Sequence, residues 1–167
     1  RININLGGSA NVFTIQSTHA GTEVHLTTDA NDIVNVQSTA SATFVTTLTG
    51  SNTINVGSLA PNTGGLLSGI QGALTITGTG NDTLNLDDTG SLAGVNNTGV
   101  MASTNSSSTL DGINMGTIDG THSITYTGLA QLNLNFGAAN YKLAITGTYN
   151  NSTGSVVTTV NTGRGTN

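Results

Sequence analysis

The chain has 167 residues, of which 7% are charged and none is cysteine, and its formal net charge is -5. With only three basic residues it offers little to a phosphate backbone, so we expect no nucleic-acid partner. No apolar stretch approaches the roughly 18 residues of a membrane span, so we expect no membrane insertion, and without cysteine there is no disulfide scaffold or thiolate metal site.

Apolar and polar residues alternate in short runs along the whole chain, which is the two-residue period of a β-strand. No long segment has a helical period, and Asn, Thr, Ser and Gly are poor residues for helix interiors. The sequence therefore predicts an all-β fold.

A first family of strands is marked by an apolar residue, an Asn and a second apolar residue. Along the chain this tripeptide occupies residues 2–4, 34–36, 54–56, 84–86 and 132–134. Residues 13–15 and 143–145 have the same pattern with a small residue in the middle. The surroundings repeat as well, because residues 11–18 align with residues 32–39 at a shift of 21.

A second family of strands lies between these, and each leads through a short turn of Gly, Asn or Asp into the next strand of the first family. Its members are residues 24–26, 44–48, 74–76, 124–126 and 156–160. One unit is therefore two strands and a turn in about 20 residues, which is too short to bury its own apolar face. Stacking one unit per rung predicts a parallel β-solenoid (β-helix or β-roll). A β-sandwich is the alternative, but it does not explain why Asn returns to one place in each unit.

We expect the central Asn side chains to face outward in register and to hydrogen-bond from rung to rung, as amide ladders do in cross-β stacks. The residues of this predicted structural ladder are Asn3, Asn35, Asn55, Asn85 and Asn133.

Two longer features organise residues 1–167, which we predict to be a single repeat-built domain. Residues 87–122 are rich in Ser, Gly and Asn and break the rhythm, which predicts an irregular excursion or a wider rung. Residues 131–167 resemble a restart of residues 1–37. We interpret the chain as one stretch of an array, or as a subunit whose ends stack on copies of itself.

These repeats resemble the long bacterial extracellular proteins described as β-strand-repeat or filamentous-haemagglutinin-like, which are distantly similar to the haemolysin-type (RTX) calcium-binding repeats. The resemblance covers most of the chain and rests on residues 13–18, 34–39, 55–61 and 78–89. It implies a secreted or cell-surface repeat protein with an extracellular location. It does not imply an enzyme.

Residues 77–85 are the candidate calcium turn. In the calcium-binding relatives, a nonapeptide of the form G-G-x-G-x-D-x-U-x binds calcium through Gly carbonyls and Asp carboxylates, and residues 77–85 match it except at the first Gly. We expect no required cofactor; if a calcium ion binds, the expected ligands are Asp82, Asp87 and Asp88. The alternative is a plain Gly/Asn turn with positive φ.

We predict no enzyme and no catalytic residue. The eight acidic residues are spread thinly, the three histidines are far apart, and Arg1, Lys142 and Arg164 are the whole basic supply. Asp87 and Asp88 are adjacent and point to opposite faces if both lie in a strand. Paired carboxylates or a charge-neutralising groove are therefore not indicated.

Thr-x-Thr motifs such as residues 75–77 and 125–127 raise the alternative of ice or glycan binding, although the β-propensity of Thr also explains them. The expected function is a structural repeat unit of an extracellular filament or giant cell-surface adhesin. Its partners are copies of itself, assembled end to end as a homopolymer or tandem array, with surface glycans as a further candidate. The alternatives are a calcium-stabilised spacer module of a secreted repeat protein and a glycan- or ice-binding solenoid.

Overall fold

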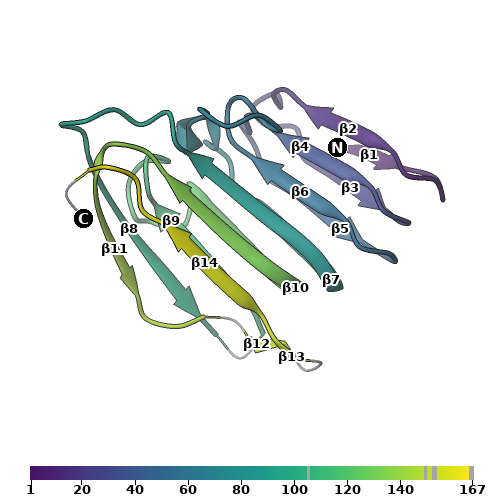
Figure 1. Ribbon diagram of the computed structural model, residues 1–167. Helices are drawn as coiled ribbons and strands as arrows, with labels where there is room; N and C mark the ends of the chain where they lie inside the picture. Colours follow the sequence, from purple (N-terminus) through teal and green to yellow (C-terminus); the bar gives the residue numbers. More distant parts are fainter. Residues whose placement is uncertain (105, 149, 152–153, 166–167) are drawn as a thin grey trace.

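The computed structural model describes residues 1–104, 106–148, 150–151 and 154–165, and it is all-β as predicted (Figure 1). The strands are β1 (Ile2–Asn5), β2 (Val12–Ile15), β3 (Val24–Thr28), β4 (Ile33–Val36), β5 (Thr43–Thr47), β6 (Thr53–Val56), β7 (Leu74–Asp88), β8 (Asn96–Ser103), β9 (Ser108–Gly112), β10 (Ser123–Phe136), β11 (Asn140–Ile145), β12 (Asn150–Asn151), β13 (Gly154–Ser155) and β14 (Val157–Asn161), with one short 3-10 helix, η1 (Leu67–Gly69). Among the described residues, no helix is both long enough and apolar enough to cross a membrane.

Strands β1 to β6 alternate between the two sides of one folded 12-stranded sheet. The A side consists of β1, β3, β5, residues 74–77 of β7 and residues 124–127 of β10, and continues through β9, β8 and β11. The B side consists of β2, β4, β6, residues 83–86 of β7, residues 131–135 of β10, and β14. β7 and β10 belong to both sides because each turns the corner between them without ending.

Equivalent strands of consecutive rungs pair in parallel and in register, for example β3 with β5 and β4 with β6. This stacking confirms the predicted parallel β-solenoid and distinguishes it from a β-sandwich. The two termini lie at opposite ends of the stack (Figure 1). We call the end formed by β1 and β2 the N-terminal end, and the end formed by β11 and β14 the C-terminal end.

The apolar core lies between the two sides. Between the two ends of the stack, the inward side chains of the B strands are almost completely buried, as are those of the A strands. A third, irregular side is closed by Leu67, Ile70, Ile113 and Met115, all with 1% or less of their surface exposed. The parallel bridge between Thr39 and Ile70 carries this third side from one rung to the next.

The assignment of three strands to families was wrong. β1 lies on the A side, where Asn3 is opposite His25, and β11 lies on the A side while β14 lies on the B side. From β1 to β6 the chain alternates between the two sides, so β1 and β2, which are consecutive, cannot both belong to the family of residues 34–36. An apolar-polar-apolar tripeptide fits either side equally well. The pairing of β2 with β4 places β2 on the B side and therefore β1 on the A side.

The excursion of residues 87–122 begins inside β7, which ends at Asp88, and contains the hairpin of β8 and β9. β9 pairs antiparallel with β10, and β8 pairs in parallel with β11, so the hairpin widens the A side by two strands. Residues 132–134 lie on the B side whereas residues 2–4 lie on the A side. The described part of 131–167 therefore does not repeat the places occupied by 1–37.

Candidate assembly surfaces at the two ends of the stack

The N-terminal end exposes two strand edges. Among the described residues, β1 pairs with β3 alone and β2 with β4 alone. Inward side chains of these strands, including Ile4, Phe13 and Ile15, line an open hollow of about 420 Å³. Ile2 and Val12 are 49% and 69% exposed. An unpaired edge with exposed apolar residues is a template for another strand.

The C-terminal end has the same character. Within the part of the chain that the structure describes, β11 pairs with β8 alone and β14 with β10 alone. An apolar hollow of about 200 Å³ lies between these two edges. Its lining residues are Phe136, Tyr141, Leu143, Ile145, Val160 and Thr162. Ile145 is 49% exposed and Val157 is 60% exposed.

The strand directions at the two ends agree. β9 is antiparallel to both β10 and β8, so β8 and its parallel neighbour β11 run in the direction of β10 and therefore of β1. On the B side, β14 is parallel to β10 and thus to β2. The strand directions therefore allow a second copy to pair in parallel with either edge of the C-terminal end.

The predicted Asn residues of the B side form a continuous chain of side-chain hydrogen bonds. Asn133 Nδ2 donates to Asn85 Oδ1 at 2.8 Å, Asn85 donates to Asn55 at 2.9 Å, and Asn55 donates to Asn35 at 3.0 Å. Asn35 Nδ2 then donates to Thr14 Oγ1 at 3.2 Å.

Asn3 does not join this ladder, since it lies on the A side. Asn35 is only 1% exposed and therefore does not lie on an open outer face, and the loop after β6 is hydrogen-bonded to Gln37, two residues further along the chain. Gln37 Nε2 holds that loop by donating to the Ala60 carbonyl at 2.8 Å.

A second ladder runs along the corner between the two sides, and sequence reasoning missed it. Asn11 N donates to Asp32 Oδ1 at 2.7 Å, Asp32 N donates to Asn52 Oδ1 at 2.9 Å, and Asn52 N donates to Asp82 Oδ1 at 2.9 Å. Each of these residues immediately precedes a B strand or its equivalent, at spacings of 21, 20 and 30. This recurrence of Asn or Asp before each B strand is the sequence pattern from which the second ladder could have been predicted.

Asp82 is completely buried, and protein groups satisfy both of its carboxylate oxygens. Oδ1 accepts from the backbone and side-chain nitrogens of Asn52 at 2.9 and 2.8 Å. Oδ2 accepts from Thr47 Oγ1 at 2.7 Å and from Thr79 N at 2.9 Å. The carboxylate therefore closes the turn and joins it to the previous rung.

Asp87 and Asp88 lie at the opposite end of the B part of β7 from Asp82, about 17 and about 20 Å away at 3.3 Å per residue. Asp87 Oδ2 accepts from Gly65 N at 2.7 Å, and Oδ1 accepts from Thr89 Oγ1 at 2.6 Å. The three expected calcium ligands are thus not brought together. No group of three or more His, Cys, Asp or Glu residues in the described ranges is placed to hold a metal ion.

Asp88 joins the solenoid to the excursion and to the C-terminal end. Its Oδ1 accepts from Leu67 N at 3.0 Å and from Asn114 Nδ2 at 2.8 Å, and its Oδ2 lies 2.8 Å from Tyr141 Oη. Burial raises the pKa of Asp88 above its ordinary value; the hydrogen bonds from Asn114, Leu67 and Tyr141 oppose this rise, and neighbouring Asp87 adds to it.

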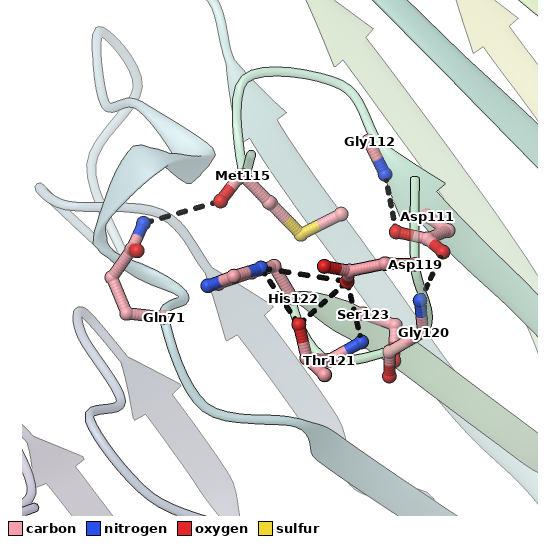
Figure 2. A network of polar contacts seen from close by, with 9 residues as sticks. All are labelled: Gln71, Asp111, Gly112, Met115, Asp119, Gly120, Thr121, His122 and Ser123. Carbon is pink, nitrogen blue, oxygen red and sulfur yellow. Dashed lines mark hydrogen bonds and ion pairs between the residues drawn. The ribbon is translucent and has the colours of Figure 1, made fainter. Parts of the chain in front are cut away.

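The turn that follows β9 holds a polar network on the surface (Figure 2). Asp119 Oδ1 accepts from Thr121 Oγ1 at 2.5 Å and from Thr121 N at 2.9 Å, and these bonds lower the pKa of Asp119. Asp119 and the Thr121 hydroxyl both approach the same nitrogen of His122, Nδ1, at 3.6 and 2.9 Å. A Ser-His-Asp relay places acid and hydroxyl on opposite ring nitrogens, so this arrangement orders a turn and does not activate a nucleophile.

The outer face of the A side carries a column of threonines. Thr27, Thr46, Thr77 and Thr127 are opposite one another on four consecutive rungs. In the neighbouring column, His25 and Phe44 stack at a ring distance of 4.4 Å and replace threonine on two of these rungs.

Comparison with family models, with curated proteins and with solved structures finds no match for this chain.

Proposed function

We propose that this chain is a structural unit of an extracellular filament or a large cell-surface adhesin, and that it assembles by end-to-end stacking of β rungs. The observation that carries the proposal is that each end presents two strand edges without a strand partner among the described residues, and that the strands of the two ends run in the same directions. Contacts that join different surfaces of two copies generate open filaments when the rotation does not close a ring.

The apolar composition of the two ends supports this assembly. Each end leaves core residues only partly buried, Phe13 at one end and Leu143 and Val160 at the other, around an open hollow. Stacking removes this apolar surface from water, at about 25 cal/mol per Å² buried. It also satisfies the backbone groups of the edge strands.

The extracellular location rests on the resemblance to bacterial β-strand-repeat and filamentous-haemagglutinin-like proteins. A chain with 7% charged residues is also suited to contact between filaments, because little charge repels neighbouring flanks. Both carboxylate oxygens of Asp82 accept hydrogen bonds from protein groups, so we propose that the fold does not require a cofactor at this turn.

Electron microscopy and fibre diffraction of the purified chain test the proposal. We expect filaments that grow with protein concentration and a strong axial reflection near the spacing of β-strands, about 4.8 Å. Compact particles of monomer size at all protein concentrations would contradict the proposed assembly.

A second candidate function is binding of an ordered surface, either ice or a crystalline glycan, by the outer A face. The four-rung threonine column favours it, because the hydroxyls repeat at about 4.8 Å along the stack. Ice-affinity retention and sedimentation with insoluble glycans test it. Thr77→Lys should abolish binding, and Thr83→Lys, on the B part of the same strand, should not.

A further inference from the structure

The side-chain columns of the B side indicate how two copies meet. Thr14 is opposite Asn35 at the N-terminal end, and Thr159 is opposite Asn133 at the C-terminal end, so one column contains the whole Asn ladder with a threonine at each limit. If β2 of a second copy continues this column on β14, Thr14 of that copy falls opposite Thr159.

The same alignment brings together the two most exposed valines of the edge strands. Val12 and Val157 are two residues before Thr14 and Thr159, on the outer face, and are 69% and 60% exposed. Between the ends this column contains Ile33, Thr53, Thr83 and Gln131. Pairing the valines covers one apolar side chain with another, in the way cross-strand apolar pairs stabilise a sheet.

The inner face agrees with this register. Ile15 of the second copy falls opposite Val160, which lines the hollow of the C-terminal end. A slip of one residue would turn Phe13 and Ile15 to the outer face and Val12 and Thr14 into the core. The hydroxyl of Thr14 accepts from Asn35 and keeps its own proton for the next rung, where Thr159 Oγ1 can accept it.

We infer that β14 of one copy pairs in parallel with β2 of the next copy, with Val157 opposite Val12 and Thr159 opposite Thr14. This inference rests on the proposed end-to-end assembly and adds its polarity, head to tail, and its register. The partner is a second copy of this chain.

Disulfide cross-linking tests the register directly, because the chain has no native cysteine. Neighbouring strands are about 4.8 Å apart, within the range of Cα separations that a disulfide spans. In the double variant Val12→Cys with Val157→Cys, we expect oxidation of assembled protein to give a ladder of covalent multimers on a non-reducing gel. Thr14→Cys with Thr159→Cys is a second in-register pair.

Two controls use the same first position. Val12→Cys with Thr159→Cys is displaced by two residues, which separates the Cα atoms by about 8 Å, beyond the reach of a disulfide, and should stay monomeric. Val12→Cys with Ile33→Cys joins neighbours within one chain and should give an internal disulfide without multimers, which reports that β2 is folded.

The outcomes separate the two proposals. Filaments of the unmodified chain with multimers only from the in-register pairs support the inference. Filaments whose off-register pair cross-links, or whose single Val12→Cys variant gives covalent dimers, overturn the register or the polarity while end-to-end assembly stands. Absence of any assembly by the unmodified chain overturns both.

Discussion

At the scale of single residues, buried carboxylates organise this chain without forming a shared site. Asp82 closes a corner and Asp88 joins four segments of the chain, and both are completely buried. Their oxygens accept bonds from backbone and amide groups that would otherwise be buried without partners, a loss that costs roughly 1–3 kcal/mol for each group.

Asp88 makes stability depend on pH. Its folded pKa lies above its ordinary value of 3.8, so above pH 3.8 the folded carboxyl binds more protons than the unfolded one, and its contribution to stability falls as pH rises through this window. In Asp88→Asn the amide can donate to Tyr141 Oη, whose own proton can bond the Asp88 carbonyl 3.1 Å away. We expect the stability of Asp88→Asn relative to the parent chain to increase from pH 3.8 upward.

Urea unfolding of both proteins across this pH range measures the difference. Asp119→Asn is the control, since the lowered pKa of Asp119 places its effect below pH 3.8, and the stability of this variant relative to the parent should stay nearly constant well above that pH. A difference between Asp88→Asn and the parent that stays constant with pH would contradict the prediction.

Asp82→Ala should destabilise the fold strongly, with or without calcium. The substitution leaves the buried Asn52 amide and Thr47 hydroxyl without their acceptor, and we expect a loss of about 3 kcal/mol. Urea unfolding in calcium and in chelator checks this. A loss that appears only in calcium, together with destabilisation of the parent chain by chelator, would restore Asp82 as a metal ligand.

At the scale of elements, two long strands and one inserted hairpin determine the shape of the C-terminal half. β7 and β10 pass the corner side by side, and Gly78 and Gly128 meet there. Gly128 has φ +67°, and a Cβ added to it would lie 2.0 Å from the Gly78 carbonyl oxygen. The close approach requires glycine for space as well as for conformation.

Gly128→Ala should therefore cost more than the conformational strain of positive φ. The matched control is Gly21→Ala, since Gly21 has φ +80° but no atom within 4 Å of its added Cβ. We expect about 1–2 kcal/mol for Gly21→Ala and a clearly larger loss for Gly128→Ala. Thermal or urea unfolding measures both, and equal losses would show that the corner can relax.

At the scale of the whole molecule, the strand edges at the two ends determine whether the solenoid stays a monomer or continues into a second copy. Lysine on an edge strand is a common means of preventing edge-to-edge pairing. Val157→Lys places a charge where the proposed contact buries a valine, so we expect filaments to be lost while the monomer stays folded.

Leu59→Lys is the control for Val157→Lys, because Leu59 is 51% exposed but lies in the loop after β6, away from both ends. Negative-stain microscopy and light scattering compare the variants. Normal filaments of Val157→Lys, or equal loss in both variants, would contradict the role of β14.

The sequence alone was sufficient to predict the all-β class, the parallel stacking and the residues Asn35, Asn55, Asn85 and Asn133, because strand alternation and a repeated tripeptide are local properties. Only the tertiary structure decided that Asn3 lies opposite His25, that β11 and β14 exchange the expected sides, and that Asp82 is distant from Asp87 and Asp88. The physical reason is that an apolar-polar-apolar strand fits either side of the core. Its place depends on which neighbour it pairs with, and that choice is made by the alternation of the first six strands and by the hairpin inserted between β10 and β11.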